Sequence, residues 1–143
     1  MKTYLIVAIL AVLLAGCTSV KVRPVQSGLG ITDVCIQVNP RVTLEDFLPV
    51  VRDGFARHRI ATRVVAQPAP EECEAVLSYT AQTNWDFVAY LIHANLTLKR
   101  GSQILGTAEY HLAATGGLSP FKWQSTKTKM DPVIDKLLAQ VHK

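Results

Sequence analysis

The stretch from Ala75 to Ala114 constrains the fold of this chain more than any other part of it. Apolar and polar side chains alternate along three runs, and two turns, one at Trp85-Asp86 and one near Gly101, separate these runs. Such alternation is typical of strands with one buried face, and short turns between the runs predict antiparallel hairpins. We therefore expect a three-stranded meander that needs cover on its apolar face.

The positions of the two turns predict the register of the meander. With Trp85-Asp86 as the first turn, the apolar residues of two strands meet on one face, with Leu77, Tyr79 and Ala81 opposite Ala94, Ile92 and Tyr90. At the second turn, a two-residue Gly101-Ser102 loop would set Glu109 opposite Ala94 and bury the acid. We therefore expect a three-residue loop that begins at Arg100.

The other face of the meander is polar and holds the main candidate for chemistry. In the expected register His93 lies across from Glu109, with Ser78 on its other side and His111 on the diagonal. Imidazole and carboxylate groups bind divalent metals and transfer protons. A solvated sheet face with one His–Glu pair explains the same residues, and Ser78 lies in mid-strand rather than on a nucleophile turn. We expect no enzyme, no catalytic residue and no cofactor, and keep His93, Glu109 and His111 only as candidates for a metal site.

A strand, a helix and a second strand are expected before the meander. The run Asp33–Asn39 alternates as a strand, and Ala61–Ala66 has the pattern of an edge strand. Between them, apolar residues recur at helical spacing from an N-cap at Thr43 to about Arg59. Because Pro49 lies inside this segment, we expect a kink or a late start there.

A final helix completes the expected fold. Asp131 is placed as its N-cap and Pro132 as its first residue, followed by an apolar stripe of Val133, Ile134, Leu137, Leu138 and Val141. The order is then β-α-β-β-β-β-α. This order predicts an α/β chain of the α+β two-layer sandwich type, with a mostly antiparallel sheet of four to five strands and both helices on one face.

The N-terminal residues resemble the export signal of bacterial lipoproteins. Lys2 precedes an apolar run, Tyr4–Leu14, that is too short to cross a bilayer as a mature helix, and Leu14-Ala15-Gly16-Cys17 fits the lipobox of that family. The resemblance implies that residues 1–16 are a cleaved signal peptide and that Cys17 is lipidated, which anchors the chain in a membrane. Because Thr18 and not the inner-membrane signal Asp follows, it also implies the outer membrane, with the domain facing the periplasm. The alternative is a plain signal peptide in which the cysteine occurs by chance.

The two other cysteines then form an even pair. Lipidation of Cys17 leaves Cys35 and Cys73, which we expect to form a disulfide in the oxidising periplasm. A cross-link over that loop length contributes on the order of 3 to 4 kcal/mol to stability in the chain-entropy estimate. The alternative is two buried thiols.

Composition and length limit what the mature chain can be. The full chain has fifteen Lys and Arg against eleven Asp and Glu, and removal of the signal peptide takes away Lys2 only, which leaves fourteen against eleven. This mildly basic balance is not that of a nucleic-acid-binding protein. Residues 17–32, with Pro24, Gly28 and Gly30, are expected to be a lipidated tether. Residues 33–143 are long enough for one globular periplasmic domain with a single core.

The segment Gly116–Lys129 is the candidate binding loop. It combines two aromatic residues with three lysines: Phe121, Lys122, Trp123, Lys127 and Lys129. Exposed, these residues would bind a protein partner, a lipid surface or an acidic polymer. Alternatively, the aromatic pair closes the core.

The mature chain also resembles small proteobacterial envelope lipoproteins of unknown function. The order of elements carries this likeness, together with a hairpin that ends in the segment Leu98–Gly106. The layout is similar to envelope lipoproteins that activate penicillin-binding proteins or assist lipopolysaccharide assembly, but it implies no functional residue. We expect a non-catalytic anchored lipoprotein that binds an envelope protein, the alternatives being a binder of an anionic polymer or lipid through Gly116–Lys129 and a metal protein on the histidine face.

Overall fold

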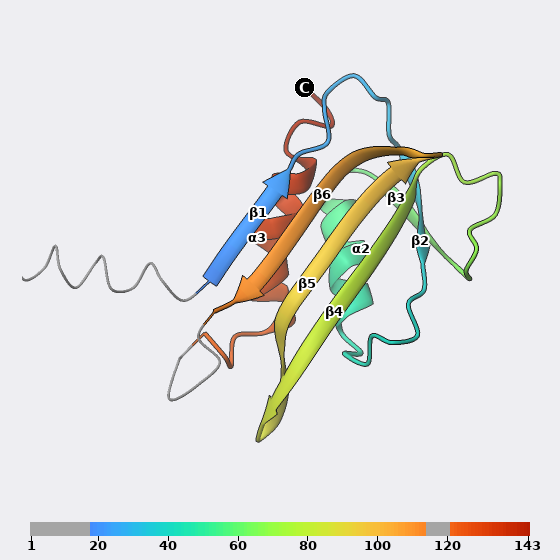
Figure 1. Cartoon of the computed structure of the whole chain (residues 1–143). Coiled ribbons are helices and arrows are strands. Elements are labelled where there is room, and N and C mark those ends of the chain that lie inside the picture. Colours follow the sequence, from blue (N-terminus) through green and yellow to red (C-terminus); the bar gives the residue numbers. More distant parts are fainter. Residues whose placement is uncertain (1–17, 114–120) are drawn as a thin grey trace, which may run out of the picture.

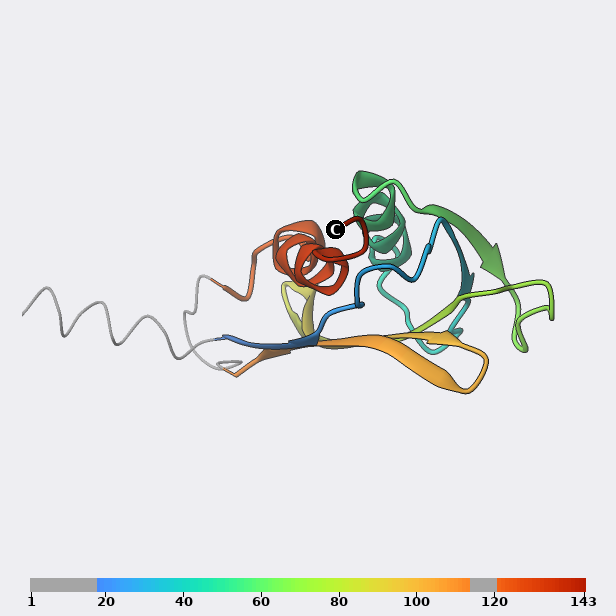
Figure 2. The same ribbon diagram turned by 90° about the horizontal axis from the view of Figure 1, so that it is seen from above.

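A six-stranded sheet and two helices form two layers in the computed structural model, which describes residues 18–113 and 121–143 (Figure 1). The strands are β1 (Thr18–Arg23), β2 (Asp33–Gln37), β3 (Ala61–Val65), β4 (Val76–Asp86), β5 (Val88–Arg100) and β6 (Gln103–Leu112), and the helices are α2 (Phe47–Arg57) and α3 (Thr126–Leu138). Both helices lie on the same side of the sheet (Figure 2). The predicted α+β two-layer arrangement is confirmed.

The sheet is mixed and larger than the sequence suggested. Its order is β1-β6-β5-β4-β2-β3; the β1–β6, β6–β5 and β5–β4 pairs are antiparallel, and β2 is parallel to both β3 and β4. The parallel pair arises because α2 returns the chain from the end of β2 to the start of β3. The expected sheet of four to five strands is therefore wrong in strand number and in element order.

The additional strand, β1, occupies part of the expected tether. It pairs with β6 from Thr18 opposite Leu112 to Arg23 opposite Thr107, and the following Val25 is fully buried. Its own side chains are mostly exposed, as is usual for an edge strand. Apolar alternation is therefore weak here, and composition alone suggested a linker.

Both hairpins of the meander differ from the expected register. The first turn is centred on Phe87, and a bulge between Gln82 and Thr83 shifts the pairing, so Ala94 lies opposite Ala81 and not opposite Leu77. Beyond the bulge the partner of Ala81 changes by four residues, from Tyr90 to Ala94, and an even shift keeps these side chains on their predicted faces. Between the bulge and the turn the shift is three residues, and Leu91, expected on the polar face, is buried in the core.

In the second hairpin Arg100 pairs with Gln103, so its loop is the two-residue Gly101-Ser102 loop. The prediction of a three-residue loop, made to avoid burial of Glu109, is wrong. A second bulge, between Leu98 and Lys99, then moves Glu109 to the polar face opposite Asn95. The bulge therefore keeps Glu109 out of the core, which is the effect that the three-residue loop was expected to have.

The helix boundaries differ from the sequence prediction at both N-termini. Helix α2 begins at Phe47 and not after Thr43, so Pro49 lies in its first turn, as the expected late start required. Helix α3 begins at Thr126, with Ser125 accepting a hydrogen bond from the Thr128 amide at 3.1 Å, so Asp131 is not its N-cap. Pro132 lies inside α3, where it cannot donate a backbone hydrogen bond, and the turn before it buries Thr126 and Met130.

The core fills the space between the sheet and the helices. The predicted stripe of α3 is buried throughout, as are Phe47, Val51 and Phe55 of α2. Cys35 and Cys73 form the expected disulfide, which joins β2 to the loop before β4. No helix in the described part of the chain is long and apolar enough to cross a membrane.

Candidate functional site

The sheet face opposite the helices carries mostly polar side chains. Four neighbouring strands contribute to it, and the helices leave it uncovered (Figure 2). The register aligns its side chains in three rows across β4, β5, β6 and β1: Gln82, His93, His111 and Ser19; Thr80, Asn95, Glu109 and Lys21; Ser78, Thr97, Thr107 and Arg23. We refer to these twelve residues as the open face.

The predicted histidine cluster lies within the open face, in a different arrangement. His93 is directly opposite His111, and the two rings meet edge to face with centroids 5.5 Å apart. Glu109 lies one row away, and its carboxylate is 3.0 Å from His93 Nε2. Glu109 and His111 thus exchange the places that the predicted register assigned to them.

The hydrogen bond between His93 and Glu109 affects the acidity of the carboxyl group. This bond lowers the pKa of Glu109; burial opposes the shift to a smaller extent, and the nearby charge of Lys21 adds to it. Among the residues that the structure describes, no group of three or more His, Cys, Asp or Glu is placed to hold a metal ion. The cluster is therefore a cross-strand pair with a neighbouring ring, and the metal reading has no geometric support.

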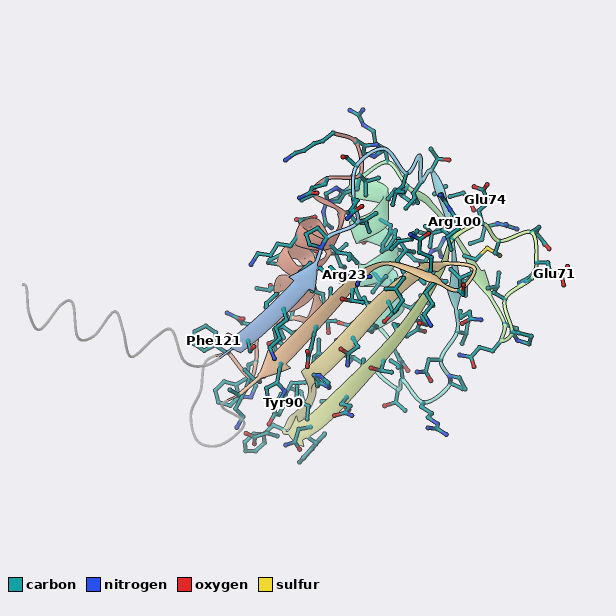
Figure 3. The ribbon with its side chains drawn as sticks, turned by 45° about the horizontal axis from the view of Figure 1, so that its top comes forward. Arg23, Glu71, Glu74, Tyr90, Arg100 and Phe121 are labelled. Atoms are coloured by element: carbon teal, nitrogen blue, oxygen red, sulfur yellow. A yellow bond between two sulfur atoms is a disulfide. The ribbon has the colours of Figure 1, made fainter. Side chains whose placement is uncertain are left out.

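Two depressions mark the open face. The larger, of about 400 Å³, lies over β1, β6 and β5 between Lys21, Arg23, Asn95 and Glu109. A smaller one, of about 80 Å³, lies between β4 and β5 beside Ser78. Arg23 stands at the end of β1 (Figure 3) and donates a hydrogen bond to the carbonyl of Ile104 at 2.8 Å. The surface thus offers hydroxyl and amide groups with cations along one edge.

The three lysines of the expected binding loop do not form one exposed surface. Lys122 and Lys129 are each only 4% exposed. Lys122 forms an ion pair with Asp86, and the Lys129 ammonium donates to the carbonyl oxygens of Leu91 at 3.1 Å and Lys122 at 3.0 Å. Burial lowers the pKa of Lys129 to about 8.

The rest of the predicted Gly116–Lys129 loop also differs from its prediction. Lys127 is exposed but pairs with Asp131 at 2.9 Å, and residues 126–129 form the first turn of α3. Phe121 packs against the core, as the alternative reading proposed, while Trp123 stays partly exposed. Residues 116–120 lie outside the described part of the chain.

A group of exposed apolar residues was missed by the sequence analysis. Trp85, Phe87 and Val88 lie at the end of the β4–β5 hairpin, which extends beyond the rest of the sheet (Figure 1). The predicted turn contains Trp85 and gives its side chain no role. The composition of the turn could have indicated them. Tight hairpin turns favour Gly, Asn and Asp, whereas this turn contains Trp85, Phe87 and Val88.

Solved structures share this fold at low sequence identity. The PelC dodecamer from Paraburkholderia phytofirmans superposes with a TM-score of 0.56 at 9% identity, covering 87% of this chain and 99% of that one. A PelC variant from the same organism gives 0.54 at 12% identity, with 88% and 99% coverage. A minor lipoprotein from Acinetobacter baumannii gives 0.30 at 12% identity, with 76% and 87% coverage.

Sequence comparison adds no family. The chain matches no protein-family model and no curated protein sequence. At the identities above, the likeness to PelC concerns the fold alone. The chain therefore has the α+β sandwich fold seen in PelC.

Proposed function

We propose that this chain is a non-catalytic lipoprotein of the bacterial envelope that binds a protein partner on its open face. The single observation behind the proposal is the low charge of that surface. Of its twelve positions only three are Lys, Arg or Glu, namely Lys21, Glu109 and Arg23, and two of these lie on the edge strand β1. The centres of protein interfaces are depleted of charged residues in the same way, whereas solvated faces are rich in Lys and Glu.

The proposed place is the periplasmic side of the outer membrane. Support comes from the lipobox that ends at Cys17 and from Thr18 as the residue that follows it. The Cys35–Cys73 disulfide is consistent with an oxidising compartment. β1 begins at Thr18, so an acylated Cys17 would hold the sheet close to the membrane without a long linker.

A second copy of the chain is one form that the protein partner can take. PelC proteins of this fold were solved as dodecamers, and the sheet has two end strands, β1 and β3, whose outer edges can pair with another chain. Binding of an anionic polymer through Gly116–Lys129 has less support, because Lys122 and Lys129 are buried.

In-cell photocrosslinking tests the proposal on the full-length chain. A photoreactive phenylalanine is placed at Asn95, in the middle row of the open face, and at Asp53, an exposed position on α2, as a matched control. We expect a discrete protein adduct from position 95 and none from position 53. An adduct of twice the chain's own mass identifies a second copy.

Two results would contradict the proposal. One is that positions 95 and 53 give the same adducts, because the open face would then be no different from the helix layer. The other is that position 95 gives only lipid adducts or none, because no protein then covers that face. Mass spectrometry of the N-terminal peptide checks separately that Cys17 is acylated.

A further inference from the structure

We propose that four apolar side chains, Trp85, Phe87 and Val88 at the end of the β4–β5 hairpin and Trp123 before α3, insert into the interfacial layer of the lipid membrane. We call them the aromatic tip. This inference rests on the anchor at Cys17 that the proposed function includes, and adds a second membrane contact made by the domain itself.

Exposure is the first argument. The exposed fractions are 71% for Trp85, 85% for Phe87, 56% for Val88 and 45% for Trp123. Val88 and Trp123 line one small hollow, so these residues from distant parts of the chain are neighbours. Indole rings are enriched at the membrane interface, where one end meets hydrocarbon and the other meets water. An amphipathic surface of this composition fits that layer.

The backbone of Phe87 is the second argument. Its φ of 63° lies in the left-handed region, which Asn and Gly enter more readily than an aromatic residue. Phe87 is at once strained and the most exposed large apolar residue of the described chain. Packing gives no reason for such a residue, whereas strain of this kind collects at functional sites.

The tip is held in place by buried lysines. Lys122 pairs with Asp86 of the hairpin, and its ammonium lies 5.4 Å from the centre of the Trp123 ring and 5.7 Å from that of Tyr90 (Figure 3 labels Tyr90). Lys129 bonds the carbonyl oxygen of Leu91 in the adjoining part of β5. Trp123 and the hairpin are thus fixed beside each other, and the apolar surface exists before any membrane is met.

The position of the tip is the third argument. Ser19 and His93 both lie opposite His111, so β1 and β5 are level at this row. From His93 the strand continues for about 20 Å to Phe87, and β1 begins towards the same end at Thr18, the residue that follows Cys17 in the sequence (Figure 1). A bilayer that holds acyl chains on Cys17 is therefore within reach of the tip.

Tryptophan fluorescence tests the proposal, because Trp85 and Trp123 are the only two tryptophans in the chain. The full-length acylated protein is reconstituted in vesicles of phosphatidylethanolamine and phosphatidylglycerol, with and without lipids brominated near the headgroup end of the acyl chains. Bromine quenches only tryptophans that contact the lipid. We expect strong quenching in the native chain and in each single variant, Trp85→Phe and Trp123→Phe.

Ile104 provides a matched control position. It is 42% exposed and lies next to the β5–β6 turn, at the opposite end of the sheet from the tip. A chain with Trp85→Phe, Trp123→Phe and Ile104→Trp has one tryptophan at that far end. We expect no quenching by brominated lipid in this variant.

The outcomes separate this inference from the proposed function. If Cys17 is acylated and brominated lipid does not quench Trp85 or Trp123, the tip does not insert and the inference is wrong. Shielding from aqueous iodide without quenching by brominated lipid would show a protein contact instead, which also overturns it. An unmodified Cys17 would overturn the anchor in the proposed function, and with it the basis for the tip.

Discussion

Gly106 allows β6 to approach α3 and the residues that follow β1. A Cβ atom at this position would lie 2.8 Å from Val25 Cγ2, 3.0 Å from Leu137 Cδ1 and 3.1 Å from the carbonyl oxygen of Arg23. The first two contacts are with side chains, but the third is with backbone and is not relieved by a change of rotamer. The absence of a side chain here therefore sets how closely the two layers pack.

We predict that Gly106→Ala destabilises the fold. Overpacking of this kind lowers the free energy of unfolding by about 1 to 3 kcal/mol. Urea denaturation followed by circular dichroism measures the change, and Thr107→Ala, on the open face, is the control with an expected effect within about 0.5 kcal/mol. Equal urea midpoints for the two variants would contradict the prediction, because the sheet and the helix would then move apart enough to accommodate the added methyl group.

Lys129 is a buried cation that donates hydrogen bonds to two uncharged carbonyl groups. Its folded-state pKa is about 8, against the 10.5 of a solvated lysine, because burial disfavours the charged form. Between these values the unfolded chain binds more protons than the folded one, so stability must rise with pH in that window. Below about pH 8 both states carry the charge, and the full cost of burying it remains.

We predict that Lys129→Met removes this rise. From pH 8 to pH 10.5 the native chain should gain up to about 3 kcal/mol in the free energy of unfolding relative to the variant. Tyr110, whose pKa is raised to about 12 by burial, has the opposite effect at the top of the range in both proteins and cancels. Parallel urea titrations over this pH range give the difference, and parallel curves would show that Lys129 is solvated.

At the scale of elements, the β4–β5 hairpin combines a stabilising and a destabilising feature. Close to the turn, β5 is tied to α3 through the hydrogen bond from Lys129 to Leu91, while the turn itself keeps a strained Phe87. A turn selected for stability alone would have Gly or Asn at that position. Phe87 therefore lowers the stability of the hairpin, and the proposed contact with lipid gives a reason for its presence.

We predict that Phe87→Asn makes the protein more stable while weakening the proposed lipid contact. Asn tolerates the left-handed backbone, so the free energy of unfolding should rise by roughly 1 kcal/mol. Val88→Asn is the control, because no positive φ is found at Val88 and the change should not stabilise. Thermal unfolding of both variants decides the point, and a destabilised Phe87→Asn would mean that the phenyl ring packs against the fold.

How far the sequence predicted these elements depends on how each side chain is used. The faces of the meander and the stripe of α3 follow from periodicity, since burial of one face enforces the pattern. The bulges after Gln82 and Leu98 do not, because they depend on packing between strands that are distant in sequence. β1 was missed because an edge strand with one solvated face needs little apolar alternation.

The candidate site followed the same limits. The polar character of the open face was predictable. The partners of Glu109 were not, because they depend on a bulge that no local sequence pattern indicates. Lys122 and Lys129 seemed exposed because lysine usually is, and their burial depends on the hairpin that covers them. The disulfide was predictable because only two cysteines remain beyond the lipobox.

At the scale of the whole molecule, the strands run from the proposed membrane end to the β5–β6 turn. The first described residue of β1 and the aromatic tip lie towards one end, and Gly101 lies at the other (Figure 1). The open face lies along the side between them. A domain held at one end by both the acyl chains and the tip would stand upright on the membrane, with its open face pointing sideways and accessible from the periplasm.

Energy transfer to labelled lipid headgroups tests this orientation. If Cys17 is acylated and Cys35 is bonded to Cys73, an introduced cysteine is the only free thiol in the chain. We place one at Ala89, near the tip, and one at Ser102 in the β5–β6 turn, both exposed and separated by about 40 Å of strand. In vesicles, a donor at position 89 should transfer efficiently to headgroup acceptors and a donor at position 102 weakly. Equal transfer from both would mean that the sheet lies flat or tumbles, because only an upright domain places its two ends at such different heights.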